Sequence, residues 1–99
     1  MHVLHLDLRD GFKHDDVVVY INDHESARAS DLTTDLTISH AASFDLAVPD
    51  GPFTLRLEAP KQGVSASTVV DAAETPHVAA FILNGTPIFR KLKEAIPML

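Results

Sequence analysis

Apolar residues recur at every second position in segment after segment of this chain of 99 residues, and this spacing constrains its fold more than any other feature. Successive side chains point to opposite faces of a β-strand, so the spacing is typical of strands with one buried face. Leu4, Leu6 and Leu8 alternate with histidine and aspartate, and residues 53–57 alternate in the same way. The sequence therefore predicts an all-β protein.

Nine segments are expected to form strands. They cover residues 3–8, 16–22, 25–30, 35–40, 43–48, 53–59, 64–71, 77–83 and 86–90. The third segment, Glu25–Ser30, holds mainly small and polar residues and could be a short edge strand or a loop; we assign it as a strand. In the fourth segment, Leu36 and Ile38 are expected to face the core.

Turn residues predict hairpins between neighbouring strands. The clearest is His2–Asn22, in which two strand patterns flank an acidic loop at residues 9–16. Residues 49–51, Pro-Asp-Gly, supply a fixed φ, a turn-forming carboxylate and a residue free to adopt positive φ. Asn84–Gly85 is the strongest two-residue hairpin signal, and Asn22-Asp23-His24 predicts another tight turn.

Eight or nine short strands with turns at this spacing predict a two-sheet antiparallel, Ig-like β-sandwich that forms a single domain over residues 1–99. Phe44, Phe53 and Phe81 fall at core positions in this pattern, whereas Phe12 and Phe89 do not. In the tail, residues 91–99, the spacing of Lys91–Ile96 suits a short helix that Pro97 ends.

Part of the chain resembles a known class of domain. Val48–Pro60, Ser65–Asp71 and Phe81–Leu83 resemble the closing strands of transthyretin-like and carboxypeptidase-regulatory-like modules, in which a Pro-x-Gly-x-aromatic-x-Leu hairpin precedes two more strands. The chain is also similar to short uncharacterised bacterial β proteins. The first resemblance implies a small, non-catalytic β-sandwich with an accessory or adhesion-type interaction role.

Composition excludes several functions. The formal charge of −6 repels phosphate backbones, so nucleic-acid binding is not expected. No cysteine is available for a disulfide or a thiolate metal site. No apolar run approaches the roughly 20 residues of a membrane span, and no signal peptide is recognised, so we expect a cytosolic protein that does not enter membranes.

Successive antiparallel strands would gather the acidic loops at one end of the sandwich. The carboxylates and histidines expected there are Asp10, His14, Asp15, Asp16, Asp31, Asp35, Asp50, Asp71, Glu74 and His77. Asp10, Asp15 and Asp16 are the types of ligand that bind Ca²⁺ in loops. His14 and His77 could meet Asp15 or Asp16 in a Zn²⁺ or Fe²⁺ site. The alternative is that aspartate is simply a common turn residue.

Enzymatic activity is not expected, because the sequence lacks a Gly-x-Ser-x-Gly elbow, a cysteine and a glycine-rich phosphate loop. The favoured hypothesis is a non-catalytic interaction module that binds a protein partner or itself, as a two-fold dimer formed through an edge strand or the apolar tail Ala95–Leu99. The alternative is that the tail folds back and caps the sandwich of its own chain. A cation-binding module is the second hypothesis, and a small metal-dependent enzyme is the third.

Overall fold

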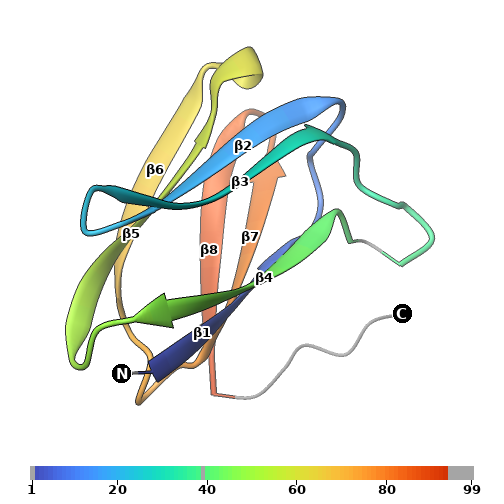
Figure 1. Ribbon diagram of the computed structural model, residues 1–99. Coiled ribbons are helices and arrows are strands. Elements are labelled where there is room, and N and C mark those ends of the chain that lie inside the picture. Colours follow the sequence, from blue (N-terminus) through green and yellow to red (C-terminus); the bar gives the residue numbers. More distant parts are fainter. Residues whose placement is uncertain (1, 39, 94–99) are drawn as a thin grey trace.

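The computed structural model describes residues 2–38 and 40–93, and within them eight strands form two four-stranded sheets (Figure 1). The strands are β1 (His2–Leu8), β2 (Asp15–Ile21), β3 (His24–Leu32), β4 (Ala42–Val48), β5 (Pro52–Ala59), β6 (Val64–Asp71), β7 (His77–Leu83) and β8 (Thr86–Leu92). A short 3-10 helix, η1 (Pro60–Gln62), links β5 to β6. The predicted all-β, two-sheet sandwich is confirmed.

Sheet A has the strand order β4-β1-β7-β8, and sheet B has the order β3-β2-β5-β6. All neighbouring strands are antiparallel except β1 and β7, which are parallel. The connection from β6 brings the chain back to the end of sheet A where β1 begins, and there the His5 backbone N–H donates to Pro76 O at 2.8 Å. The sandwich therefore contains one parallel pair that the turn signals did not predict.

Two of the predicted hairpins are wrong. β1 lies in sheet A and β2 in sheet B, so the segment His2–Asn22 crosses from one layer to the other. The turn at residues 49–51 likewise carries the chain from β4 in sheet A to β5 in sheet B. Alternation identifies the buried face of a strand but not its neighbour, because strands that face each other across the core show the same pattern as strands that pair.

The two-residue turns, by contrast, form true hairpins. Asn22 and Asp23 have φ values of 49° and 66° and connect β2 to β3, while Asn84 and Gly85 have φ values of 52° and 75° and connect β7 to β8. Positive φ at both central residues is the signature of a type I′ turn, whose twist matches that of paired strands. Both turn predictions are confirmed.

The third and fourth predicted strands have opposite outcomes. Glu25–Ser30 is confirmed as part of β3, whereas the predicted strand at residues 35–40 is wrong. Asp35 begins a turn there, because its side chain accepts a hydrogen bond from Thr37 N at 3.0 Å and its carbonyl accepts one from Ile38 N at 3.2 Å. Leu36 is consequently 85% exposed instead of facing the core.

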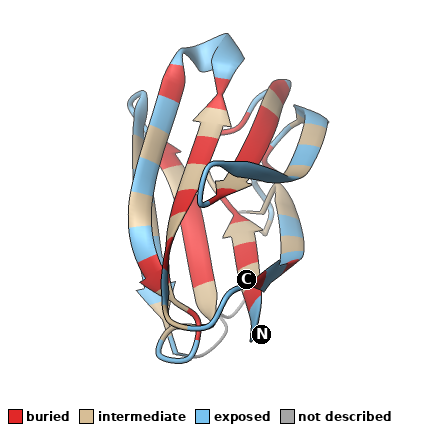
Figure 2. Ribbon diagram, turned by 60° about the vertical axis from the view of Figure 1, so that its left-hand side comes forward, coloured by how far each residue is buried: buried red, intermediate tan, exposed pale blue. Residues whose placement is uncertain are grey.

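The core lies between the two layers, where buried residues alternate with exposed or half-buried ones along the strands (Figure 2). Fully buried side chains come from both sheets: Leu4, Leu6, Leu8, Val48 and Val78 from sheet A, and Val17, Val19, Leu55, Leu57 and Val70 from sheet B. Val18 is also buried, although it points to the outer face, as expected for a residue on a central strand.

The phenylalanine predictions are partly wrong. Phe12 is only 3% exposed and belongs to the core, although it lies in the loop between β1 and β2. Phe81 is half-buried and stands outside the core cluster, because its neighbours Ala80 and Ile82 take the inward positions on β7. Phe53 is buried as predicted.

Residues 91–92, the start of the predicted helix, form the end of β8 instead. Lys91 and Leu92 continue the strand, paired with Val78 and His77. The rest of the predicted helix and the apolar tail Ala95–Leu99 lie outside the described residues. No helix in the described part of the chain has the length and apolar character needed to cross a membrane.

Candidate functional site

The absence of a strand at residues 35–40 changes which loops meet. One end of the sandwich, here called the η1 end, holds residues 9–14, 33–38, 60–63 and 84–85. The opposite end holds residues 22–23, 49–51 and 72–76. Asp50, Asp71 and Glu74 therefore lie at the end opposite Asp10, and the prediction of one acidic end built from four loops is wrong.

Asp15 joins two segments of the η1 end. Its side chain is buried, and Oδ2 accepts hydrogen bonds from Lys13 N at 2.8 Å and from Gln62 Nε2 at 2.7 Å. Gln62 Nε2 also donates to Gly11 O at 2.9 Å. The carboxylate thus holds the loop after β1 against η1, which is a structural task.

The other predicted ligands in this loop also have protein partners. His14 Nδ1 lies 2.7 Å from Asp31 Oδ1, and Asp16 accepts a hydrogen bond from Asp31 N at 3.3 Å and lies 3.8 Å from Lys61 Nζ. Asp10 contributes its backbone carbonyl, which accepts a hydrogen bond from Ile82 N at 2.9 Å. Across residues 2–38 and 40–93, no group of three or more histidine, aspartate or glutamate residues is arranged to hold a metal ion.

His14 lies in the loop after β1 at the η1 end, whereas His77 begins β7 at the opposite end of the sandwich. The prediction that these two histidines meet is therefore wrong. His77 stacks on His5 on the outer face of sheet A, with ring centroids 4.8 Å apart and planes inclined by 18°. His5 in turn forms a hydrogen bond with Asp45 of β4. Sequence reasoning missed this cluster because His5 and His77 become neighbours only through the parallel pairing of β1 and β7.

A second polar group lies on the same face, and its order of contacts differs from that of a catalytic triad. Ser43 Oγ donates to Asp7 Oδ1 at 2.6 Å, and His40 Nε2 lies 2.7 Å from Ser43 Oγ. In a serine triad the histidine accepts the hydroxyl proton and the carboxylate orients the histidine. Here the carboxylate binds the hydroxyl directly, so the histidine is not placed as its base.

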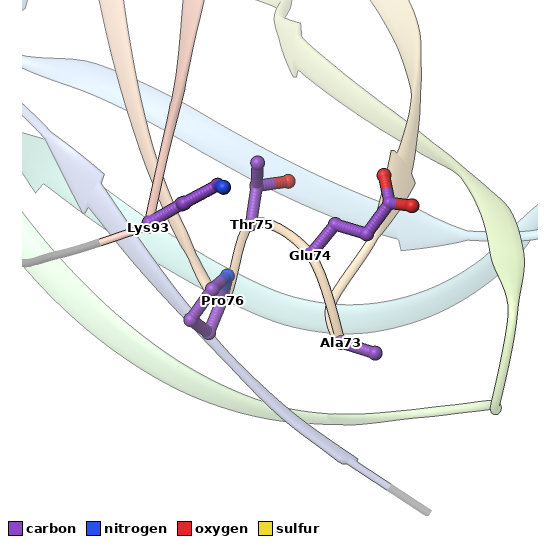
Figure 3. Close-up of a pocket in the computed structure, with 5 residues that line it drawn as sticks. All are labelled: Ala73, Glu74, Thr75, Pro76 and Lys93. Carbon is purple, nitrogen blue, oxygen red and sulfur yellow. The ribbon is translucent and has the colours of Figure 1, made fainter.

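Two hollows lie side by side near the β6–β7 connection. The larger, of about 690 Å³, is open and is lined by Ala73, Glu74, Thr75, Pro76 and Lys93 (Figure 3). The smaller, of about 320 Å³, is lined by Pro52, Val69, Asp71, Glu74, Thr75 and Lys91. Glu74 and Thr75 belong to both hollows, so the two form one shallow groove beside the adjacent ends of β6 and β8.

Among the four sheet edges, the edge of β6 differs most in composition. Each sheet has two edge strands, and natural proteins normally protect such edges with charges, prolines or irregular pairing. β3 carries Glu25, Arg28 and Asp31, β4 carries the exposed Asp45, and β8 carries Pro87, Arg90 and Lys91. Residues 64–70 of β6 contain no charged residue and no proline.

The pairing of β6 is regular along its whole length. All eight β6 residues pair with β5 without interruption, whereas the pairing of β3 with β2 has two irregularities. On β3, Arg28 also donates a hydrogen bond to Glu25, which holds the pKa of that carboxyl below its usual value. β6 therefore combines regular pairing with a stretch, residues 64–70, that has no charged residue.

The backbone of Val69 faces away from β5. Thr54, which pairs with Val69, directs both of its backbone groups toward Asn22: Thr54 N donates to Asn22 Oδ1, and Thr54 O accepts from Asn22 N, each at 2.9 Å. Backbone groups alternate in direction along an antiparallel strand, so Ser65, Ser67 and Val69 all present N–H and C=O groups to the free edge. Val69 is 59% exposed.

Comparison of the chain with protein-family models, with curated proteins and with solved structures finds no match in any of the three.

Proposed function

We propose that this protein is a non-catalytic β-sandwich interaction module that self-associates by pairing the β6 edges of two copies. The observation that carries the proposal is the regularly paired edge of β6, which has no charged residue and no proline over residues 64–70. A regular edge strand of this kind is a template for strand addition, which supplies affinity through main-chain hydrogen bonds. The transthyretin-like resemblance of residues 48–83, which include β6, also favours an interaction role.

Self-pairing of β6 is compatible with two-fold symmetry. If the axis passes beside Ser67, Ser65 faces Val69 of the second copy, and Ala66 faces Thr68 of the second copy. Val64 and Val70, which are both buried at the inner face of sheet B, then stand opposite each other across the junction. No like charges meet between residues 64 and 70, and two sheets B would join into one continuous sheet.

The substitution Ser67→Glu is expected to abolish self-association without unfolding the domain. Ser67 is exposed and stands opposite Arg56 on β5, so a glutamate gains an opposite charge within its own chain. In the dimer, the two glutamates would lie beside the symmetry axis and repel each other. Sedimentation across a range of protein concentrations should show a dimer for the unmodified chain and a monomer for S67E.

A matched control adds the same charge to another edge. Ser30→Glu places a glutamate at an exposed position on β3 and is expected to leave the dimer intact. A monomeric unmodified chain at every concentration would contradict the proposal. So would a variant pair in which S30E, and not S67E, loses the dimer.

A further inference from the structure

We infer that Lys91 controls access to the β6 edge, because its ammonium group occupies the Val69 carbonyl that an incoming strand must use. This inference rests on the proposed self-association and names the residue that regulates it. Lys91 Nζ donates to Val69 O at 3.2 Å, from β8 of sheet A to β6 of sheet B. The hydrogen bond spans the open side of the sandwich, where β6 and β8 are the edge strands of facing sheets.

The contact competes directly with strand addition. Between residues 64 and 70, only Ser65, Ser67 and Val69 direct their backbone groups away from β5, so the Val69 carbonyl is a large part of what an added strand can bind. A lysine side chain lying against this carbonyl takes up the space of the incoming backbone and leaves a charge in the new interface. An added strand must therefore displace Lys91, and its ammonium group, which is on an exposed residue, then interacts with water or with a carboxylate partner.

The groove beside Val69 provides that partner. Lys91 and Val69 line the smaller hollow together with Asp71 and Glu74, whose carboxylates are the ion-pair partners that an ammonium group takes. The lysine can thus leave Val69 O, which carries no formal charge, and pair with one of these carboxylates. With the Lys91 ammonium group on Val69 O, the β6 edge is closed. With this group among the carboxylates, the β6 edge is open.

Lys93 provides a matched comparison. It lies two residues further along the chain, carries the same charge and lines the larger hollow, where it flanks Thr75 on the side opposite Glu74 (Figure 3). A change in self-association that came only from net charge would follow loss of either lysine. A change caused by release of the Val69 carbonyl would follow loss of Lys91 alone.

The test compares dimerisation constants by sedimentation for the unmodified chain, K91M, K91R and K93M. Methionine keeps an unbranched side chain but has no hydrogen-bond donor, and we expect K91M to dimerise roughly tenfold more tightly, the equivalent of one net hydrogen bond. Arginine keeps a donor, so K91R is expected to match the unmodified chain, as is K93M. Circular dichroism of each variant verifies that the domain is folded.

The outcomes separate this inference from the proposed function. If the unmodified chain dimerises and K91M dimerises no more tightly, or if K93M gains as much as K91M, the control by Lys91 is overturned and the self-association stands. If the unmodified chain is a monomer at every concentration, the proposed function is overturned as well. A tighter K91M dimer with unchanged K91R and K93M supports both.

Discussion

Replacing Gly11 with alanine is expected to lower the free energy of unfolding by about 4 kcal/mol, a large share of the stability of a domain this size. Gly11 has a φ of +99°, which side-chain-bearing residues rarely adopt. A Cβ atom at this position would lie only 2.0 Å from Ile82 O. The clash has no easy relief, because Asp10 O accepts a hydrogen bond from Ile82 N and thereby fixes the loop against β7.

Gly63→Ala is the matched control for this prediction. Gly63 has a φ of +67°, but no atom would lie within 4 Å of an added Cβ. Its substitution should therefore cost only the backbone strain, about 1 kcal/mol. Chemical denaturation of both variants measures the difference in unfolding free energy. Equal losses of unfolding free energy would show that a Cβ atom at residue 11 does not clash with Ile82.

Phe12→Ala is expected to lower the free energy of unfolding by a similar amount, about 4 kcal/mol, because it removes a buried aromatic side chain and leaves a cavity. Phe12 closes the η1 end of the core and is only 3% exposed. Its backbone is held on both sides by Thr34: Phe12 N donates to Thr34 Oγ1 at 3.1 Å, and Phe12 O accepts from Thr34 N at 2.8 Å. The surroundings are therefore poorly able to collapse into the vacated space.

The same substitution at Phe81 is the control. Phe81 is half-buried on the outer face of sheet A, so Phe81→Ala should cost less than half as much. Thermal and chemical denaturation of the two variants compare the positions directly. A larger loss at Phe81 would mean that the outer face, and not the loop after β1, carries the more important aromatic contact.

The period-two spacing predicted most of the strands because the alternation of apolar and polar residues is a local property of the sequence. It failed at residues 35–40, where Leu36 and Ile38 fit the pattern. Asp35 accepts hydrogen bonds from the backbone N–H groups of Thr37 and Ile38, and the chain turns there. The spacing could not assign strands to sheets, since Leu4 on β1 and Val17 on β2 belong to the same core whether their strands pair or face each other.

The predicted site depended on the direction of each strand and therefore failed where that direction was wrong. Asp15 and His14 do lie at one end with Asp31, but Asp15 binds Lys13 and Gln62, and His77 stacks on His5 instead of approaching His14. The lack of charged residues at positions 64–70 was visible in the sequence. The position of β6 at a sheet edge was not visible, because it follows only from the strand order.

Residue-resolved hydrogen exchange of the unmodified chain at low and high protein concentration tests the pairing of β6 most directly. The amides of Ala66 and Thr68 face β5 and serve as internal references, protected at every concentration. The self-association through β6 predicts that the amides of Ser65, Ser67 and Val69 gain protection as concentration rises. Fast exchange of these three amides at every concentration, or protection that rises on β3, β4 or β8 instead, would contradict it.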